Sequence, residues 1–480
     1  MEYLQTTLKL AFAAYNAGRT EEAEALCRTL VQAGLEDGQM YFLLGMALHK
    51  AGEETEALQW LQRAAQVQPE MGRVFSGLGC VQQKLGDAAG AASSFARAAE
   101  LEPQQADHFF SLGNALYQLA RLEAAEAAFQ RAVALNPRDA ESWNNLGKCL
   151  KELNRVQEAI AAYDQALALD ARYGLALQGR ALSLLTAGRL AEGFRDQEER
   201  RQLSPPRHFD GARWTGQPIP GKTLLLHAEQ GFGDGIFSAR HVQLVRPHCG
   251  RVVLECRPEL KTLFVHSGVA EVVVGFGEEL PPFDFYASAA SLTGLLNLAP
   301  GNIPAVGPYL QAPMAEVPAA GGTLKVGLVW AGNPAYADDA SRSLSLEQLA
   351  PVLAVSGVTF YSLQQPLPSG NEGRLKEYPN LRVLGGFKDY LATAAAVAGM
   401  DLIIAVDTSV AHLAGALGKP VWTLVPFAPD WRWFQEFGDT TPWYPTMRLF
   451  RQSERGVWPP VIARVAGDLE RWAGRMTNAE

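Results

Sequence analysis

Small and large hydrophobic residues recur every 34 residues along the first two hundred positions of the chain. Each unit carries a glycine, an alanine twelve residues later and a large residue four positions further on, and proline closes three of the units. The recurring residues are Gly45, Gly79, Gly113 and Gly147; Ala57, Ala91, Ala125 and Ala159; Leu61, Phe95, Phe129 and Tyr163; Ala64, Ala98, Ala132 and Ala166; and Pro69, Pro103 and Pro137. A repeat of this length predicts stacked pairs of antiparallel helices. We expect the small residues where two helices cross closely, the large residues beside them, and a proline after the second helix of a pair.

This unit resembles the tetratricopeptide repeat, and the match is closest over residues 38–171. The flanking units at 4–37 and 174–200 depart from the pattern, with Ala11 at the glycine position and Gly193 where alanine is expected. Atypical end units are expected in such arrays, because one face of each meets solvent or another domain. The resemblance implies a concave groove that binds a protein or peptide, and a spacer or dimerisation arm is the alternative.

The pattern of hydrophobic positions changes after residue 200. The segment 201–222 is rich in Pro, Gly and Arg and has no period, which predicts a linker. Beyond it, short runs rich in Val, Leu and Ile alternate with helical stretches, which predicts mostly parallel strands in an α/β fold. The expected strands lie at 223–228, 251–256 and 271–276 and, after a second Pro- and Gly-rich boundary at 312–322, at 324–332, 357–364, 381–386, 401–406 and 421–425.

The predicted fold is therefore an α-helical solenoid followed by a pair of α/β halves. The predicted boundaries are 1–200 for the solenoid, 201–222 for the linker, 223–316 for an N-terminal Rossmann-like half and 317–480 for a C-terminal Rossmann-like half. Ligands bind at the carboxyl ends of parallel strands, so two such halves place a binding cleft between them. A cleft of this kind suits a nucleotide-sugar transferase.

The segment 401–420, DLIIAVDTSVAHLAGALGKP, predicts a strand, a turn and a helix that ends at Gly-Lys-Pro. Asp407 and Thr408 are good N-cap residues for this helix. The free amides and positive dipole end at its start can hold a diphosphate. His412 lies one turn into the helix, on the side of Thr408. The alternative is that Asp407 and Thr408 only cap the helix and that His412 is a packed histidine.

The stretch DTSVAHLAGALGKPVWTL resembles the signature of glycosyltransferase family 9, whose best-known members are lipopolysaccharide heptosyltransferases. The resemblance covers about residues 221–480. It implies a GT-B-like pair of Rossmann-like halves, a nucleotide-sugar donor held mainly by the second half, and inversion at the anomeric carbon without a bound metal or cofactor. It also implies that Asp407, Thr408, Ser409 and His412 contact the donor nucleotide.

A glycine-rich turn, GFGDG at 231–235, lies between a predicted strand and a predicted helix in the first half. Glycines allow the backbone to approach a ligand closely. The family has a Gly-Asp pair in this context, and Gly233-Asp234 matches it. The resemblance therefore implies that Gly233 lies beside the ligand and that Asp234 is the general base, which accepts a proton from the acceptor hydroxyl. The alternative is that Asp234 is a first-turn acid favoured by the helix dipole.

Further candidates follow strands of the second half. Arg342 is the only cation between Lys325 and Arg374, and the family has a basic residue in this loop that contacts the donor phosphates. A fixed cation stabilises a leaving diphosphate more in the transition state than in the ground state. Asn333 and Gln364 each follow a predicted strand, so we expect both to face the cleft.

Aromatic residues gather in the segment 429–452, which contains Trp431, Trp433, Trp443 and Tyr444. We expect most of this cluster to be core. The DWRW…WYP…RLFRQ pattern is associated with bacterial proteins that join tetratricopeptide repeats to a family 9-like transferase. Through that resemblance, Trp431 and Arg432 are also candidate donor contacts.

Composition narrows the function classes. The chain has 480 residues, of which 48% are hydrophobic, and a net charge of −9. The hydrophobic fraction argues against disorder, and the negative charge disfavours general nucleic-acid binding. The sequence predicts no signal peptide and no transmembrane segment. Five widely spaced cysteines without a CxxC pair predict neither a zinc ribbon nor a disulfide framework, so we expect a cytoplasmic, reduced protein.

These observations lead to the hypothesis of an inverting, metal-independent glycosyltransferase. Its partners would be a nucleotide-sugar and a protein or peptide acceptor in the repeat groove. Because heptosyltransferases do not generally carry a repeat array, we expect a protein acceptor rather than lipopolysaccharide core. The main alternative is a non-catalytic repeat scaffold with a vestigial nucleotide-binding domain, and a sugar-nucleotide epimerase is a third interpretation. The sugar, the nucleotide, the acceptor and the oligomeric state, including a homo-oligomer, stay open.

Overall fold

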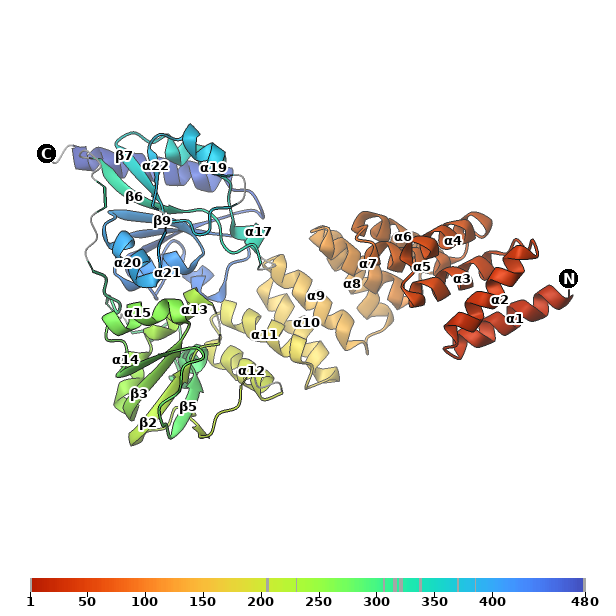
Figure 1. Cartoon of the computed structure of the whole chain (residues 1–480), viewed down its shortest axis with the longest axis horizontal. Coiled ribbons are helices and arrows are strands. Elements are labelled where there is room, and N and C mark those ends of the chain that lie inside the picture. Colours follow the sequence, from red (N-terminus) through yellow and green to blue (C-terminus); the bar gives the residue numbers. More distant parts are fainter. Residues whose placement is uncertain are drawn as a thin grey trace. The chain divides into compact units, whose positions relative to one another are not determined.

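The chain forms two compact units, residues 1–180 and 181–480. The structure is a computed structural model, in which the two units are coloured from red to yellow and from yellow to blue (Figure 1). It describes residues 2–203, 207–229, 231–304, 307–313, 317–318, 323–335, 339–368, 371–384 and 386–477.

The first unit is built of consecutive helices that pack against one another in pairs. These are α1 (Glu2–Asn16), α2 (Thr20–Gln32), α3 (Gly38–Ala51), α4 (Glu54–Val67), α5 (Gly72–Lys84), α6 (Ala88–Leu101), α7 (Ala106–Gln118), α8 (Leu122–Leu135), α9 (Ala140–Glu152) and α10 (Val156–Leu169). Helix α11 (Gly174–Thr186) crosses the boundary at residue 180, and α12 (Leu190–Leu203) belongs to the second unit.

The 34-residue pattern has the structural role expected of it. A methyl group added to any of the four periodic glycines would overlap the large residue of the same unit. The pairs are Gly45 with Leu61, Gly79 with Phe95, Gly113 with Phe129 and Gly147 with Tyr163, at 2.6 to 2.9 Å. Helices α4, α6 and α8 each end two residues before the periodic proline. The predicted close crossing of two helices in each unit is confirmed.

The first sheet of the second unit has the strand order β1-β5-β2-β3-β4, and all its pairings are parallel. Its strands are β1 (Ala212–Arg213), β2 (Ile219–His227), β3 (Cys249–Cys256), β4 (Val272–Gly275) and β5 (Phe285–Ser288). Its helices include α13 (Phe232–Ala239), α14 (Val242–Val245), α15 (Pro258–His266) and α16 (Leu292–Leu295). The three strands predicted here are present, and the sequence did not predict β1 or β5.

The second sheet has the strand order β11-β10-β9-β6-β7-β8 and is also parallel. Its strands are β6 (Leu324–Val329), β7 (Val358–Ser362), β8 (Leu381–Val383), β9 (Leu402–Val406), β10 (Val421–Val425) and β11 (Met447–Arg451). Helices α17 (Asp339–Arg342), α18 (Ala350–Leu353), α19 (Asn371–Arg374), α20 (Tyr390–Ala398), α21 (Ser409–Ala416) and α22 (Pro459–Thr477) belong to the same part of the chain. All five predicted strands are present, and only the edge strand β11 was not predicted.

The segment predicted as a linker, 201–222, is largely built into the second unit. It contains the end of α12, strand β1 and the start of β2, although residues 204–206 lie outside the described residues. Trp214 is fully buried within it, and its indole nitrogen donates to the carbonyl of Gln217. Burying a large aromatic ring and pairing β1 with β5 attach this segment to the first sheet, despite its Pro- and Gly-rich composition.

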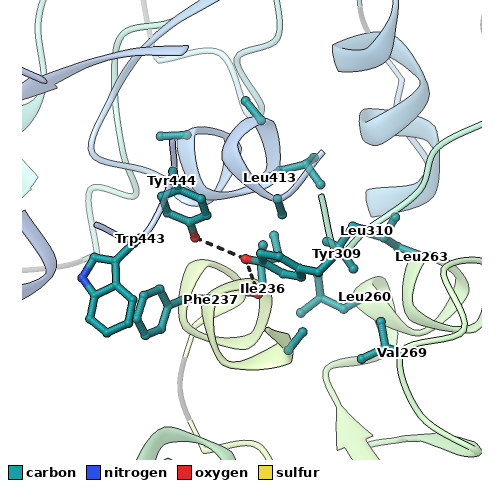
Figure 2. Packing of buried hydrophobic residues seen from close by; sticks show 14 of the residues in the cluster. Ile236, Phe237, Leu260, Leu263, Val269, Tyr309, Leu310, Leu413, Trp443 and Tyr444 are labelled. Atoms are coloured by element: carbon teal, nitrogen blue, oxygen red, sulfur yellow. Dashed lines mark hydrogen bonds between the residues drawn. The ribbon is translucent and has the colours of Figure 1, made fainter. Parts of the chain in front are cut away.

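The two sheets of the second unit share one continuous hydrophobic core. It extends from Trp214 and Phe264 near the first sheet to Leu413 on α21 and Trp433 after β10. Figure 2 shows part of this core, where α13 meets the residues Tyr309 and Tyr444. Among the helices that the structure describes, none is both long enough and apolar enough to cross a bilayer.

Candidate functional site

The carboxyl ends of strands from both sheets open onto one cavity of about 400 Å³. Glu229 and Asp234 follow β2, Arg257 follows β3, and residues 430–432 follow β10. The end of the repeat region adds three more lining residues, Leu182, Phe194 and Gln197 on α11 and α12. Three of the residues predicted from sequence, Asp234, Trp431 and Arg432, therefore line this cavity.

The glycine-rich turn brings α13 against the start of α21. A methyl group on Gly233 would lie 3.1 Å from Cδ2 of His412 and 3.5 Å from Cα of Ser409. The turn thus permits a close backbone approach, as its glycines suggest, and the partner is the DTSVAH segment. Two segments separated by more than 170 residues, each a candidate from sequence, lie side by side.

Each carboxylate oxygen of Asp234 accepts one hydrogen bond. One carboxylate oxygen, Oδ1, accepts from Nη2 of Arg432 at 2.5 Å, and the other, Oδ2, accepts from the amide of Gly231 at 3.1 Å. Arg432 also donates from Nη1 to Oδ1 of Asp430 at 2.9 Å. Asp234 and Asp430 therefore share one guanidinium, and they come from different sheets.

The guanidinium of Arg432 is held between aromatic rings. Its central carbon lies 4.7 Å from the ring centroid of Phe237 and 4.8 Å from that of Trp431. Only 11% of the side chain is exposed, and Nε has no hydrogen-bond partner among the described residues. Arg432 is thus a partly desolvated cation in the wall of the cavity, where charge interactions are stronger than in water.

His412 is a packed, neutral histidine at the back of this site. Its ring stacks on Trp433 with centroids 5.2 Å apart, and Nδ1 lies 3.0 Å from the hydroxyl of Tyr444. Burial, with a contribution from Arg432, lowers the pKa of His412 well below its ordinary value. Figure 2 shows how the hydroxyl of Tyr444 continues to that of Tyr309, which donates to the carbonyl of Ile236 on α13. The histidine is therefore the end of a buried hydrogen-bond chain between α21 and α13.

Asp407 and Thr408 do not cap α21 with their side chains. Thr408 holds the N-cap position, but its hydroxyl donates back to the carbonyl of Val406. Asp407 is buried at the end of β9, and burial, with a contribution from Asp430, raises its pKa to about 6. The predicted side-chain cap is therefore wrong. The first backbone amides of α21 receive no hydrogen bond from the side chain of Thr408. Ser409 is partly exposed at this helix start, and its hydroxyl lies 2.7 Å from that of Tyr390.

Arg342 supports the same turn. Its Nη1 donates to the backbone carbonyl of Asp407 at 2.9 Å, and its Nε donates to Asp339 at 3.1 Å. The side chain is about one quarter exposed, at 26%. Arg342 is not one of the residues that line the cavity described above.

Gln364 and Asn333 do not face this cavity. Gln364 is buried, and its amide oxygen accepts from the backbone amides of Trp330 and Ala331, which ties the end of β7 to the end of β6. Asn333 is exposed and accepts from the amide of Ala335 in its own turn. Neither residue lines the cavity, and local backbone amides occupy the two side chains.

Several cavity residues were not predicted. Glu229 accepts from Nε of the α12 residue Arg201 at 3.1 Å, and Nδ1 of His227 lies 3.3 Å from its other oxygen. Asp430 and Arg257 also escaped prediction, because neither belongs to a recognisable motif. A weak signal was present for Asp430, which lies two residues before Arg432 and so can pair with its side chain.

A second buried arginine lies behind the cavity. Arg240 is 3% exposed and donates to the carbonyl of Trp443. Its guanidinium carbon lies 4.5 to 5.3 Å from the ring centroids of Phe237, Tyr309, Trp443 and Tyr444. No metal-binding group of three His, Cys, Asp or Glu side chains occurs in the described part of the chain.

Comparisons with known proteins identify the first part of the chain. The family model described as tetratricopeptide repeat matches residues 8–70, 77–140, 110–173 and 145–202. Among curated proteins, FlbA of Caulobacter vibrioides is 28% identical over 329 residues, which cover 61% of this chain and 54% of FlbA. The chain thus spans about half the length of this curated relative.

Two solved structures are similar to part of the chain. YrrB, described as a tetratricopeptide-repeat protein with an unusual peptide-binding site, is 20% identical with a TM-score of 0.35, covering 38% of this chain and 93% of YrrB. MamA is 20% identical with a TM-score of 0.34, covering 36% of this chain and 97% of MamA. The N-terminal part of the chain thus consists of tetratricopeptide repeats, and an α/β part with two parallel sheets follows it.

Proposed function

We propose that the protein is an inverting, metal-independent glycosyltransferase with a GT-B-like pair of halves. The observation that carries this proposal is the cavity at the carboxyl ends of both sheets, where Asp234 from one sheet faces Arg432 from the other. Parallel α/β sheets bind their ligands at this edge. A carboxylate and a cation in one cavity supply the base and the diphosphate contact that sugar transfer from a nucleotide donor needs.

In the proposed reaction, Asp234 takes the proton of an acceptor hydroxyl. The freed electron pair of that oxygen forms the new bond to the anomeric carbon of the donor. The bond from this carbon to the diphosphate breaks, and its electron pair leaves with the nucleoside diphosphate. Arg432 offsets the charge that develops on the leaving group.

The start of α21 is the proposed second seat for the diphosphate. Thr408 and Ser409 are partly exposed, and no side chain caps the helix. Helix starts of this kind bind phosphate through their free amides. Asp407 and His412 are buried, so we assign them the task of holding α21 in place. The direct contact of Arg342 with donor phosphates stays a prediction.

The proposed acceptor is a protein or peptide held by the repeats. Repeat solenoids present extended concave surfaces that suit such partners. The last matched repeat also supplies Leu182, Phe194 and Gln197 to the cavity wall. These three residues belong to the second unit and lie in the same cavity wall as Asp234.

The proposal is tested by nucleotide release from sugar donors. The full chain is incubated with UDP-N-acetylglucosamine, GDP-mannose, dTDP-rhamnose and ADP-heptose, with water in place of the acceptor. We expect slow release of nucleoside diphosphate from at least one donor, reduced in Asp234→Asn by about 10²-fold or more because the base is lost.

The control variant for this experiment is Asp439→Asn, since Asp439 is a half-exposed aspartate outside the cavity lining. Its release rate should equal that of the unmodified chain. If no donor is either bound or cleaved, the non-catalytic scaffold becomes the better interpretation.

A further inference from the structure

We propose that Arg432 is a latch on the base: a bound diphosphate competes with Asp234 for its guanidinium and, by taking it, uncovers the proton-accepting oxygen of Asp234. This inference rests on the function proposed above and adds to it an order in which the two substrates bind. The donor has to bind before an acceptor hydroxyl can be activated.

Both carboxylate oxygens of Asp234 already accept a hydrogen bond, and 30% of the side chain is exposed. Its two oxygens accept from Arg432 at 2.5 Å and from the amide of Gly231 at 3.1 Å. Because Oδ1 already accepts from Arg432, an acceptor hydroxyl has to compete with that guanidinium for this oxygen. A working base in this position therefore requires that Arg432 turn to another partner.

Arg432 has one partner close to it in the sequence and one far from it. Asp430 lies two residues away and accepts from both the backbone amide of Arg432 at 3.0 Å and its Nη1 at 2.9 Å. Asp234 is 198 residues away and holds only Nη2. Asp430 can therefore keep its hydrogen bonds while Nη2 moves from Asp234 to a phosphate oxygen.

A diphosphate competes for the guanidinium of Arg432 more strongly than a carboxylate does. It carries more negative charge and offers several oxygens to the fork of donors on a guanidinium, which suits phosphate. The Nε of Arg432 has no partner among the described residues and supplies a further donor. Stacking against Phe237 and Trp431 keeps the guanidinium at the cavity wall throughout the exchange.

The cavity also contains a second cation that can contact the other phosphate of a bound diphosphate. Arg257, from the first sheet, lines the same cavity and contributes another cation. Glu229, the third carboxylate of the wall, is already paired with Arg201 at 3.1 Å.

The experiment is calorimetric titration of the full chain with inorganic pyrophosphate. Asp234→Asn keeps an oxygen for the amide of Gly231 but loses the charge that attracts Arg432. We therefore expect it to bind pyrophosphate more tightly than the unmodified chain, by about tenfold. Arg432→Lys should bind at least about tenfold more weakly, since lysine lacks the fork of donors.

Further variants separate the latch from a general effect of charge. Asp430→Asn should weaken pyrophosphate binding, because the guanidinium loses its fixed partner, although this variant also removes one negative charge. Asp439→Asn should leave binding unchanged. Asp234→Ser repeats the test with a smaller residue, and thermal unfolding of each variant shows that it is folded.

Opposite shifts for Asp234→Asn and Asp430→Asn support the latch. Equal or weaker binding by Asp234→Asn, or no pyrophosphate binding by the unmodified chain, overturns it. The proposed function fails by a different result, the absence of nucleotide release from the sugar donors. A chain that shows the opposite shifts but cleaves no donor would keep the competition for Arg432 and lose the glycosyl transfer.

Discussion

At the scale of single residues, the sequence predicted candidate residues but not which of them meet in the fold. Asp234 and Arg432 were both candidates, yet their pairing across 198 residues is a property of the fold. Motifs cannot show it, because it depends on how the loop after β10 is placed against α13. Gln364 follows a strand as expected, but backbone amides nearby occupy its side chain, and it does not line the cavity.

Buried histidines make the stability of the second unit depend on pH. Burial, followed by nearby arginines, lowers the pKa of both His227 and His241 to about 3 from the usual 6.5. Because the folded-state pKa is depressed, their contribution is present above pH 6.5 and is lost as the pH falls toward 3. Between pH 7 and 5 we expect a loss of about 2 kcal/mol in unfolding free energy for each of these histidines.

Asp407 changes the pH dependence of stability in the opposite direction. Its pKa is raised to about 6, so its ionisation costs stability as the pH rises through that value, and a fall to pH 5 returns about 1 kcal/mol. Denaturant unfolding at pH 7, 6 and 5 measures the net change, which should be a loss. His241→Gln should have a smaller loss than the unmodified chain. An unchanged pH dependence in that variant would contradict the buried, neutral state of His241.

At the scale of elements, hydrophobic runs predicted the central strands and the repeat helices well. Strand β5 was missed because FYAS has no run of Val, Leu or Ile, and β11 because arginine occupies both its second and its last position. The meeting of α13 and α21 was not predicted from the pattern either. The glycines of the turn indicated that another segment packs closely against α13, but not that this segment is α21.

A methyl group at the contact between α13 and α21 should destabilise the second unit. In Gly233→Ala the new Cβ would lie 3.1 Å from His412 and 3.5 Å from Ser409, so the two helices must separate slightly. We expect a loss of about 1–3 kcal/mol in unfolding free energy and weaker pyrophosphate binding. Gly301→Ala is the matched control, since nothing lies within 4 Å of its Cβ. Equal stability of the two variants would show that this contact is not tight.

At the scale of the whole molecule, the period of 34 residues and the change of pattern near residue 200 predicted the order of the parts. The boundary between the two compact units lies at residue 180, inside α11, which the composition did not indicate. The reason is packing: Leu185 and Leu190 belong to the same hydrophobic core as Trp214 and the first sheet. Repeat periodicity continues through this point and therefore conceals the boundary.

Separate cores predict that the two units unfold separately in calorimetry. Gly113→Ala, whose Cβ would lie 2.6 Å from the ring of Phe129, should lower the transition of the repeats alone. Gly233→Ala should lower the transition of the α/β unit alone. Mutations that share no partners act independently, so each variant assigns one transition. A single transition that both variants shift equally would contradict the division at residue 180.

The central claim is that Asp234 and Arg432 form the catalytic pair of a sugar transferase. The most direct test is the rate of nucleotide release from the four sugar donors by the unmodified chain, Asp234→Asn and Asp439→Asn. We expect the unmodified chain and Asp439→Asn to release nucleoside diphosphate. Release by Asp234→Asn should be slower by about 10²-fold or more. Release by Asp234→Asn at the full rate, or no release by any form of the chain, would contradict it.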